Sequence, residues 1–420
     1  MKKYLVGGAV RDFLLKIPIK ERDWLIIGSS PKEMLDIGYQ QVGKEFPVFL
    51  HPQNHEEYAL ARTEKKHGRG YAGFICQTSP KITLEEDLYR RDLTINAIAR
   101  DEQGNIIDPY NGQKDIKLRI LRHVSNLFQE DPLRILRVAR FAAQFAHLNF
   151  RIAPETLNLM KKMIYELPSL SPERIWIETK KSLSTKNPQI YFTVLKNCGA
   201  LKIVFPEIQD LFNNKIVSPN NNEPENNIGV IALSTLKIAA NLTNNIAVRF
   251  ATICKDLGEN KEQIKGYKNK IHKETIGTKI IDNLCKRLKI PNFLCNTAKI
   301  INKYHKQIDD IHLETPDKII KLFDEIDVWR HPERLEHMLL AKEANFRTSN
   351  KFKNQPYLSK KFLYQAYSIT RHINVSEIIK KGIKGKEIKK EIFNQRQKKI
   401  FKWKKLNNKY KHLYPQFKNN

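Results

Sequence analysis

Cysteine is scarce in this sequence, and it is not arranged for metal or disulfide chemistry. The 420 residues hold only five cysteines, and no two of them have the C-x-x-C spacing of a zinc site. Five scattered thiols also do not form the dense pattern of a small secreted disulfide scaffold. The sequence therefore excludes both classes, and it suits a protein of the reducing cytoplasm.

Long hydrophobic runs are also missing. No apolar stretch approaches the roughly 20 residues that a helix needs to cross a bilayer. The N-terminus begins like a signal peptide, but Arg11 and Asp12 interrupt the apolar segment too soon. We therefore predict a soluble cytoplasmic protein that has no membrane partner.

Acidic residues are far fewer than basic ones. The chain has 74 Lys and Arg against 45 Asp and Glu, which gives a net charge of +29. Such an excess favours a polyanionic partner, and nucleic acid is the usual one. The alternative is a composition bias towards lysine, which the many Asn and Ile residues also fit. Residues 351–420 hold twenty Lys or Arg, three acidic residues and several aromatic ones, so they form either an RNA-contacting surface or a solvated tail.

The hydrophobic pattern changes once along the chain, and no repeat of fixed period is present. Up to about residue 125, short apolar runs alternate with turns, which predicts a small α/β domain. The predicted strands are 4–6, 24–27, 48–50 and 58–61. From Pro132 onward a helical period dominates, and Asp131 followed by Pro132 is typical of a helix start. The polar stretch 213–227 contains two prolines and predicts a linker.

Two short motifs near the N-terminus could carry phosphoryl-transfer chemistry. Gly7 and Gly8 follow a predicted strand and open a predicted helix, so the backbone there can approach a phosphate closely. Glu21 and Asp23 lie two residues apart, and such residues on a strand point to the same face. Two carboxylates beside a phosphate-binding turn suit a two-magnesium site. Alone, a glycine turn and an acidic pair on a solvated strand edge are both common.

Taken together, the two motifs resemble the DNA polymerase β nucleotidyltransferase superfamily. The glycine pair and the acidic pair are separated by twelve residues. The resemblance implies a third carboxylate on a neighbouring strand. Glu57 is our candidate, because it stands at the start of the strand predicted at 58–61. Glu56 and Glu64 are the alternatives.

Three further motifs narrow the family. Residues 90–97 read RRDLTINA, residues 130–134 read EDPLR and residues 171–174 read SPER. With GGAVRD at 7–12, they resemble the class II tRNA nucleotidyltransferases, the CCA-adding enzymes, in their proteobacterial form. The resemblance is dense over residues 1–210 and weaker to about 345. It implies a polymerase β-like α/β head followed by an all-α neck, body and tail. The segments are 1–130 (head), 131–212 (neck), 213–227 (linker), 228–345 (body) and 346–420 (basic tail).

The resemblance also implies roles for individual residues and Mg²⁺ as the cofactor. Those implied to bind the nucleotide are Gly8, Arg11, Arg91, Arg137 and Arg140. Those implied to be catalytic are Glu21, Asp23 and Glu57, of which the first two hold magnesium. Those implied to form an amino-acid template for the base are Glu130, Asp131 and Arg134.

The template has a chemical rationale. Cytosine and adenine both present an amino donor beside a ring-nitrogen acceptor, whereas uracil and guanine present the reverse order. An Asp can accept from the amino group, and an Arg can donate to the ring nitrogen. Asp131 and Arg134 are three residues apart, so on a helix they share one face. A surface ion pair is the common alternative use of this spacing.

The sequence departs from the family at two positions. Glu21 stands where the family usually has Asp, and magnesium demands strict geometry, so we expect an active but slower enzyme. Lys255 stands where relatives with a C-terminal HD phosphohydrolase domain have a metal-ligating His. Because a lysine cation opposes metal binding, we predict that phosphohydrolase activity is absent.

The predicted function is addition and repair of the CCA end of tRNA. The enzyme would use CTP and ATP without a nucleic acid template and release pyrophosphate. Its partners would be the tRNA 3′ end, ATP and CTP, and the chain would act as a monomer or homodimer. The alternatives are a poly(A) polymerase of the same class and a catalytically dead tRNA-binding protein.

Overall fold

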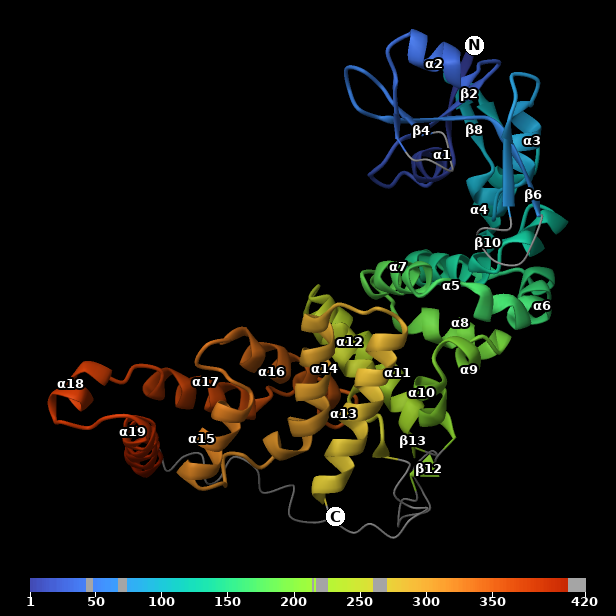
Figure 1. Ribbon diagram of the computed structural model, residues 1–420. Coiled ribbons are helices and arrows are strands. Elements are labelled where there is room, and N and C mark those ends of the chain that lie inside the picture. The colour runs from blue at the N-terminus through green and yellow to red at the C-terminus, as the bar shows by residue number, and fades with distance from the viewer. Residues whose placement is uncertain (43–47, 67–73, 214, 217–225, 260–269, 407–420) are drawn as a thin grey trace. The chain divides into compact units, whose positions relative to one another are not determined.

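The chain forms two compact units, Met1–Pro206 and Glu207–Asn420 (Figure 1). This computed structural model describes residues 1–42, 48–66, 74–213, 215–216, 226–259 and 270–406. The first unit is an α/β domain that continues into helices, and the second is mainly helical. The predicted fold class is therefore confirmed, whereas the boundaries of the five predicted segments stay predictions.

A seven-stranded sheet with the order β3-β4-β5-β2-β1-β8-β9 is the centre of the first unit. Its strands are β1 (Lys2–Val6), β2 (Asp23–Ile27), β3 (Gln40–Val42), β4 (Val48–Leu50), β5 (Glu57–Leu60), β8 (Ala99–Asp101) and β9 (Ile106–Ile107). The pair β2–β5 is parallel, and every other neighbouring pair is antiparallel. Because parallel strands start at the same edge, the first residues of β2 and β5 lie side by side there.

Alternation along the strands explains how the sheet is covered on both faces. Leu25 of β2 packs with Val6 on one face, and the next residue, Ile26, packs with Phe49 and Tyr58 on the other. Short apolar runs bounded by turns predicted β1, β2, β4 and β5; the alternation between the two faces appears in the structure. The structure starts β1, β2 and β5 one or two residues earlier than predicted.

Helices follow the sheet in the first unit. Those that alternate with its strands are α1 (Gly8–Leu14), α2 (Pro31–Asp36), α3 (Leu84–Tyr89) and α4 (Gly112–Leu118). Those beyond one end of the sheet are α5 (Leu133–Phe145), α6 (Pro154–Met163), α7 (Pro172–Leu183), α8 (Gln189–Cys198) and α9 (Leu201–Val204) (Figure 1). The α5 helix packs against α7 and α8. It begins directly after Pro132, and the Asp131 side chain accepts from the backbone N–H of Leu133 at 3.0 Å, as expected for a cap.

Three further strand pairs in the described residues were not predicted. They are β6 (Arg62–Lys66) with β7 (Phe74–Thr78), β10 (Ile120–Leu121) with β11 (Arg151–Ile152), and β12 (Lys215–Ile216) with β13 (Asn226–Asn227). The last pair lies within the predicted linker 213–227, of which residues 214 and 217–225 lie outside the described part. The two-residue strands carry no usable periodicity, and β6 (RTEKK) has no apolar run, so neither gave a signal in the sequence.

The second unit is built from helices after the short α10 (Pro206–Gln209). They are α11 (Ile228–Leu242), α12 (Ile246–Cys254), α13 (Lys270–Arg287), α14 (Asn292–Tyr304), α15 (Pro316–Glu325), α16 (Glu333–Phe346), α17 (Leu358–Thr370), α18 (Val375–Lys380) and α19 (Lys386–Leu406). The α12 helix is buried from Ala247 to Cys254, because α11, α14 and α16 pack around it.

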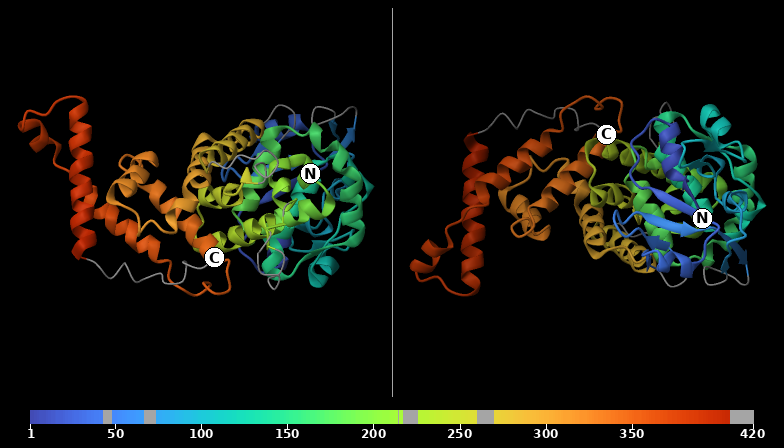
Figure 2. Two further views of the ribbon diagram at one scale, coloured as in Figure 1. Left: turned by 90° about the horizontal axis from the view of Figure 1, so that it is seen from below. Right: turned by 90° about the horizontal axis from the view of Figure 1, so that it is seen from above.

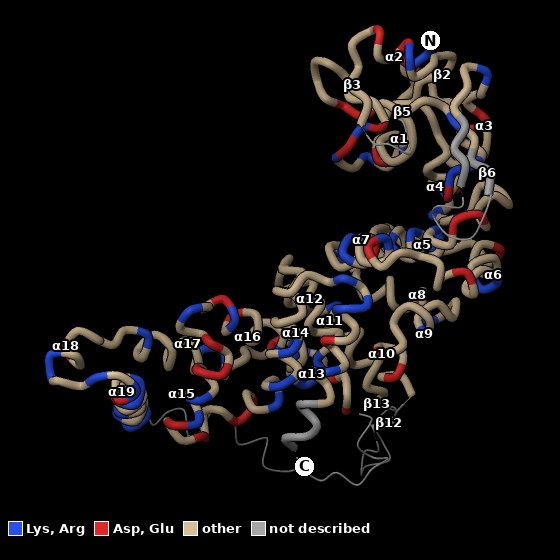
Figure 3. The backbone as a smooth tube through the Cα atoms, viewed as in Figure 1, with Lys and Arg blue, Asp and Glu red and all other residues tan. Residues whose placement is uncertain are grey.

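The tail helix α19 is long, basic and only partly packed. Figure 2 shows it as one uninterrupted helix, and Figure 3, where it is seen nearly end-on, shows Lys and Arg on it. Its contacts include those of Trp403, whose ring lies 5.1 Å from that of Phe362, and of Arg396, whose guanidinium lies 3.3 Å from the ring centre of Trp329. The sequence-predicted basic tail is thus helical up to Leu406, and residues 407–420 lie outside the described part. No helix in the described ranges is long and apolar enough to span a membrane.

Candidate active site

The glycine turn lies where β1 passes into α1. Gly7 has φ +69°, a backbone conformation that side chains with a Cβ rarely adopt. A Cβ built there would lie 2.8 Å from Nη1 of Arg91. Gly8 is the first residue of α1 and lines the same cavity as Arg91. The turn therefore brings bare backbone close to an arginine, as a phosphate-binding turn requires.

Three carboxylates stand at one edge of the sheet. Asp23 is the first residue of β2 and is the direct register partner of Glu57, the first residue of β5. Glu21 lies two residues before β2 and not on it, so the predicted strand geometry of the Glu21–Asp23 pair is wrong. The chain enters the sheet only at Asp23, because β1, the antiparallel partner of β2, ends at Val6 opposite Asp23. All three acidic residues nevertheless line one cavity.

Glu56, the alternative to Glu57, is used elsewhere. Its carboxylate accepts from Nε1 of Trp24 at 2.7 Å and pairs with Arg22 at 3.4 Å. It is not part of the cavity lining that the structure describes. The neighbour with the opposite side-chain direction, Glu57, faces the cavity, as alternation along a strand requires.

The pKa of Asp23 is raised by its surroundings. Desolvation raises its pKa, and the neighbouring Glu21 carboxylate raises it further, whereas Arg91 opposes the shift. The net shift is upward. A carboxylate whose ionised form is disfavoured in the empty protein gains when a cation arrives, which is a property expected of a metal ligand.

A chain of hydrogen bonds fixes two of the predicted nucleotide-binding arginines. Arg11 donates to the Asn96 side-chain oxygen at 2.6 Å, and Asn96 donates to Asp92 at 2.9 Å. Arg137 of α5 donates to the other oxygen of Asp92 at 2.7 Å. Burial by itself raises the pKa of Asp92, but Arg137 and Asn96 outweigh burial and lower it well below the usual range. Arg11 is also held by Asp12, at 2.7 Å.

Arg140 is anchored differently. Its Nε donates to Glu178 of α7 at 2.5 Å, and its guanidinium lies 4.0 Å from the ring centre of Phe141. Glu178 is buried. Arg91 donates to Asp87 at 3.1 Å. The described geometry thus brings all four predicted arginines and Gly8 to one cavity; their contacts with a nucleotide stay predictions.

The residues of the predicted template are placed by contacts that the sequence did not reveal. Asp131 pairs with Arg174 of α7, at 2.8 Å. Arg134 donates to the backbone carbonyls of Leu127, at 2.9 Å, and Arg90, at 2.5 Å. Asp131 and Arg134 line the cavity, whereas Glu130, which ends the short 3₁₀ helix Asn126–Glu130, is not among the lining residues that the structure describes.

The cavity joins these groups within the first unit. Its volume is about 1070 Å³, and its lining includes eleven Lys or Arg and six Asp or Glu. The acidic lining residues are Asp12, Glu21, Asp23, Glu57, Asp92 and Asp131. An arginine-rich cavity with a carboxylate group at one edge suits a polyanionic ligand that arrives with a metal ion.

Many residues of this cavity were not assigned a role from the sequence, and five of them are polar or charged residues of interest. They are Asp12, Asp92, Asn96, Arg174 and Lys181. The first four lie inside the motifs GGAVRD, RRDLTINA and SPER, so these motifs could have pointed to them. What the sequence did not show was that Asp12, Asp92 and Asn96 hold arginines of the cavity and that Arg174 holds Asp131.

Comparison with known proteins identifies the family. The model of the poly A polymerase head domain matches residues 3–122, and that of a probable RNA- and SrmB-binding site of polymerase A matches residues 149–212. The CCA-adding enzyme of Blochmanniella pennsylvanica is 54% identical over 406 residues, which is 96% of this chain and 99% of that protein. This chain belongs to the CCA-adding enzyme family. The resemblance inferred from the motifs is confirmed.

Solved CCA-adding enzymes share the fold of this chain. A complex of one of them with ATP has a TM-score of 0.64, at 20% identity over 95% of this chain and 85% of that chain. The Thermotoga maritima CCA-adding enzyme in complex with tRNA-CCA has a TM-score of 0.62, at 20% identity over 95% of this chain and 87% of that chain. At this level of identity the similarity concerns the fold alone.

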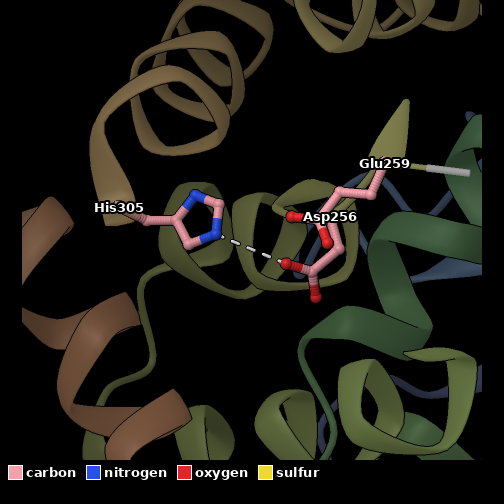
Figure 4. Close-up of side chains that lie close together, drawn as sticks. All are labelled: Asp256, Glu259 and His305. Atoms are coloured by element: carbon pink, nitrogen blue, oxygen red, sulfur yellow. Dashed lines mark ion pairs between the residues drawn. The ribbon is translucent and has the colours of Figure 1, made fainter. Parts of the chain in front are cut away.

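A second group of chemically active side chains lies in the other unit of this CCA-adding enzyme. Asp256, Glu259 and His305 have ligand atoms within 4.8 Å of one another, so they could hold a metal ion. The three side chains point towards one another in Figure 4. The ammonium of Lys255, the residue predicted to replace a metal-ligating histidine, contacts the Asp256 carboxylate.

Proposed function

We propose that the cavity of the first unit adds C, C and A to the 3′ end of tRNA. This proposal rests mainly on one observation. A single cavity contains the carboxylates of Glu21, Asp23 and Glu57 together with the glycine turn and the arginines. In the proposed reaction the tRNA 3′-hydroxyl attacks the α-phosphate of CTP or ATP, and pyrophosphate leaves. Family membership supports this reaction, as does the named complex of a relative with ATP.

The proposed cofactor is Mg²⁺. Carboxylate oxygens are the ligands that Mg²⁺ prefers, and Glu21 and Asp23 would hold it beside Glu57. When bound, Mg²⁺ would lower the pKa of the attacking hydroxyl and neutralise charge on the triphosphate. The longer side chain of Glu21 remains a competent oxygen ligand, so we expect activity at a reduced rate.

The arginines and the template perform separate tasks in this proposal. The phosphates and sugar are bound by Arg11, Arg91, Arg137 and Arg140. Asp92, Glu178 and other acidic residues hold the guanidinium groups of these arginines in place. Asp131 and Arg134 select the base by accepting from its amino group and donating to its ring nitrogen. Their supporting contacts, to Arg174 and to two backbone carbonyls, restrict both side chains before a nucleotide arrives. For Glu130 we retain the template role only as a prediction.

We further propose that phosphohydrolase activity is absent from the second unit. Lys255 replaces the metal-ligating histidine and places its ammonium on Asp256, the neighbouring ligand. The basic second unit would instead bind tRNA through its phosphates, as a monomer or a homodimer in the cytoplasm.

The test is incorporation of labelled CTP and ATP, with Mg²⁺, into tRNA that lacks its CCA end. We expect addition of CCA followed by termination, a faster Glu21→Asp variant and an inactive Asp23→Asn variant. Repeated A addition without C would instead identify a poly(A) polymerase. Tight tRNA binding with no transfer by the wild type or by Glu21→Asp would identify a non-catalytic tRNA-binding protein.

A further inference from the structure

Asp256, Glu259 and His305 are arranged partly like the ligands of a metal site. His305, at the start of the 3₁₀ helix His305–Ile308, has its Nδ1 3.0 Å from the carbonyl of Ile301 and 3.1 Å from that of Asn302. A carbonyl only accepts, so Nδ1 carries the proton and Nε2 is the nitrogen that faces Asp256, 3.4 Å away. Metal-binding histidines are commonly oriented by such a bond from the other ring nitrogen.

Lysine side chains already neutralise the negative charge of the carboxylates around Asp256. Each of three neighbouring carboxylates forms an ion pair with a lysine ammonium. The pairs are Lys255–Asp256, Lys306–Glu259 and Lys342–Asp309. Lys255 and Lys342 are buried, and burial lowers the pKa of Lys342, although Asp309 opposes that shift. Among the described residues the charges therefore balance, and a divalent ion would add positive charge that nothing offsets.

The backbone that carries Lys255 is held in place independently of the lysine. The side-chain amide of Asn302 donates to the carbonyls of Cys254, Lys255 and Leu257, at 3.2, 2.9 and 3.1 Å. Gly258 has φ +93°, and a Cβ there would lie 2.8 Å from the backbone nitrogen of Gly277 in α13. The turn thus keeps its form through contacts with α13 and α14, so exchange of one side chain need not reshape the site.

We propose that the Lys255 ammonium is a built-in cation that occupies the place of a metal ion and holds this part of the helical unit together. It neutralises Asp256 inside the protein, as an ion would, and it removes the need for an ion. The inference extends the proposed absence of hydrolase activity and is independent of CCA addition. It has a specific consequence: Lys255→His removes the charge, adds an imidazole ligand and creates a metal site with Asp256, Glu259 and His305.

The experiment measures Ni²⁺ binding to the full-length protein by equilibrium dialysis, with excess Mg²⁺ present to fill the carboxylate site of the first unit. Imidazole ligands suit Ni²⁺, and carboxylates suit Mg²⁺. The proteins are the wild type, His305→Ala, Lys255→His, Lys255→His with His305→Ala, and Lys255→Met, which removes the charge and offers no imidazole. We expect Lys255→His to bind one equivalent more than the wild type and Lys255→Met, and the double variant to lose that equivalent.

Thermal unfolding gives a second readout that does not depend on Lys255→His folding. We expect Lys255→Met to unfold several degrees below the wild type when both are measured in the same buffer, because Asp256 loses its cation. The proposal is overturned if the wild type binds an equivalent of Ni²⁺ that His305→Ala removes, if folded Lys255→His gains none, or if Lys255→Met is as stable as the wild type. CCA addition by the same preparations tests the proposed function separately.

Discussion

At the scale of single residues, Asp23 combines a proposed role in metal binding with a cost to folding stability. Its pKa is raised by desolvation and by the nearby Glu21 carboxylate, against the effect of Arg91. A carboxyl group whose folded pKa lies above its unfolded value of about 3.9 stabilises the protein only in its protonated form. That contribution is complete below the unfolded pKa and is lost as the pH rises through the folded pKa.

We therefore predict that Asp23→Asn is more stable than the wild type at pH 7 without Mg²⁺, although it is inactive. Nucleotide transfer should fall by more than about a hundredfold, since altering even the partner of a metal ligand costs ten- to a hundredfold. Thermal unfolding in EDTA measures the stability, and its gain should shrink towards pH 4. An unfolding temperature below that of the wild type at pH 7 would contradict the sign of the pKa shift.

Arg174 is the second residue whose role can be isolated. It holds one oxygen of Asp131, while the other oxygen accepts from the Leu133 N–H. We predict that Arg174→Ala loosens the carboxylate and raises the KM for CTP and ATP roughly tenfold, the value of one charged hydrogen bond. Misincorporation of UTP should rise as well, and Arg174→Lys should recover part of the selectivity. Lower stability with unchanged base selectivity would show that Arg174 supports only the fold.

At the scale of elements, Asp92 ties the segment after α3 to helix α5. It accepts from Arg137 of α5 and from Asn96, and the result is a pKa well below its usual range despite burial. The sign is opposite to that of Asp23. A carboxyl group with a lowered folded pKa stabilises the protein above its unfolded pKa, and the contribution is lost as the pH falls through the folded pKa.

Asp92→Asn should destabilise the protein by about 2–3 kcal/mol at pH 7, somewhat less than a fully buried pair because Arg137 is partly exposed. The difference from the wild type should decrease as the pH falls below about 4, near the unfolded pKa. Urea unfolding at several pH values measures this change. Asp36→Asn, at an exposed position in α2, is the matched control and should be neutral.

At the scale of the whole molecule, the excess of basic charge should govern tRNA binding. With a net charge of +29, we expect the affinity for tRNA to fall steeply with salt, because each neutralised phosphate releases counterions. The exposed Lys389, Lys390 and Lys398 of α19 are candidates for binding phosphates. Replacing all three with Ala should weaken binding and reduce the salt slope by about one for each phosphate that is no longer neutralised.

The control for this experiment lies on the first unit. Lys32, Lys114 and Lys117 are exposed and are not part of the cavity lining that the structure describes. Their replacement with Ala removes the same charge from the chain. If both triple variants change the salt slope of tRNA binding equally, the effect is one of net charge. If the α19 variant leaves the affinity and the slope unchanged, α19 is exposed to solvent and does not contact tRNA.

The sequence by itself determined the parts of this protein that depend on near neighbours in the chain. The glycine turn, the strand that Glu57 opens and the Asp131 cap of α5 follow from short-range patterns, because backbone conformation, alternation and capping act within a few residues. The same motifs led to the CCA-adding enzyme family. Glu21 shows the limit of such patterns, since it lies two residues outside the strand on which its spacing from Asp23 predicts it.

Only the tertiary structure decided which of these residues meet. The parallel pairing of β2 with β5 sets Asp23 beside Glu57, and the packing of α5 on α7 brings Asp131 to Arg174. At Lys255 the identity of the residue predicted an obstacle to metal binding, but the three lysine–carboxylate pairs around it appear only in the fold. Such pairings depend on strand order and helix packing, which join segments far apart in the chain and which no local pattern encodes.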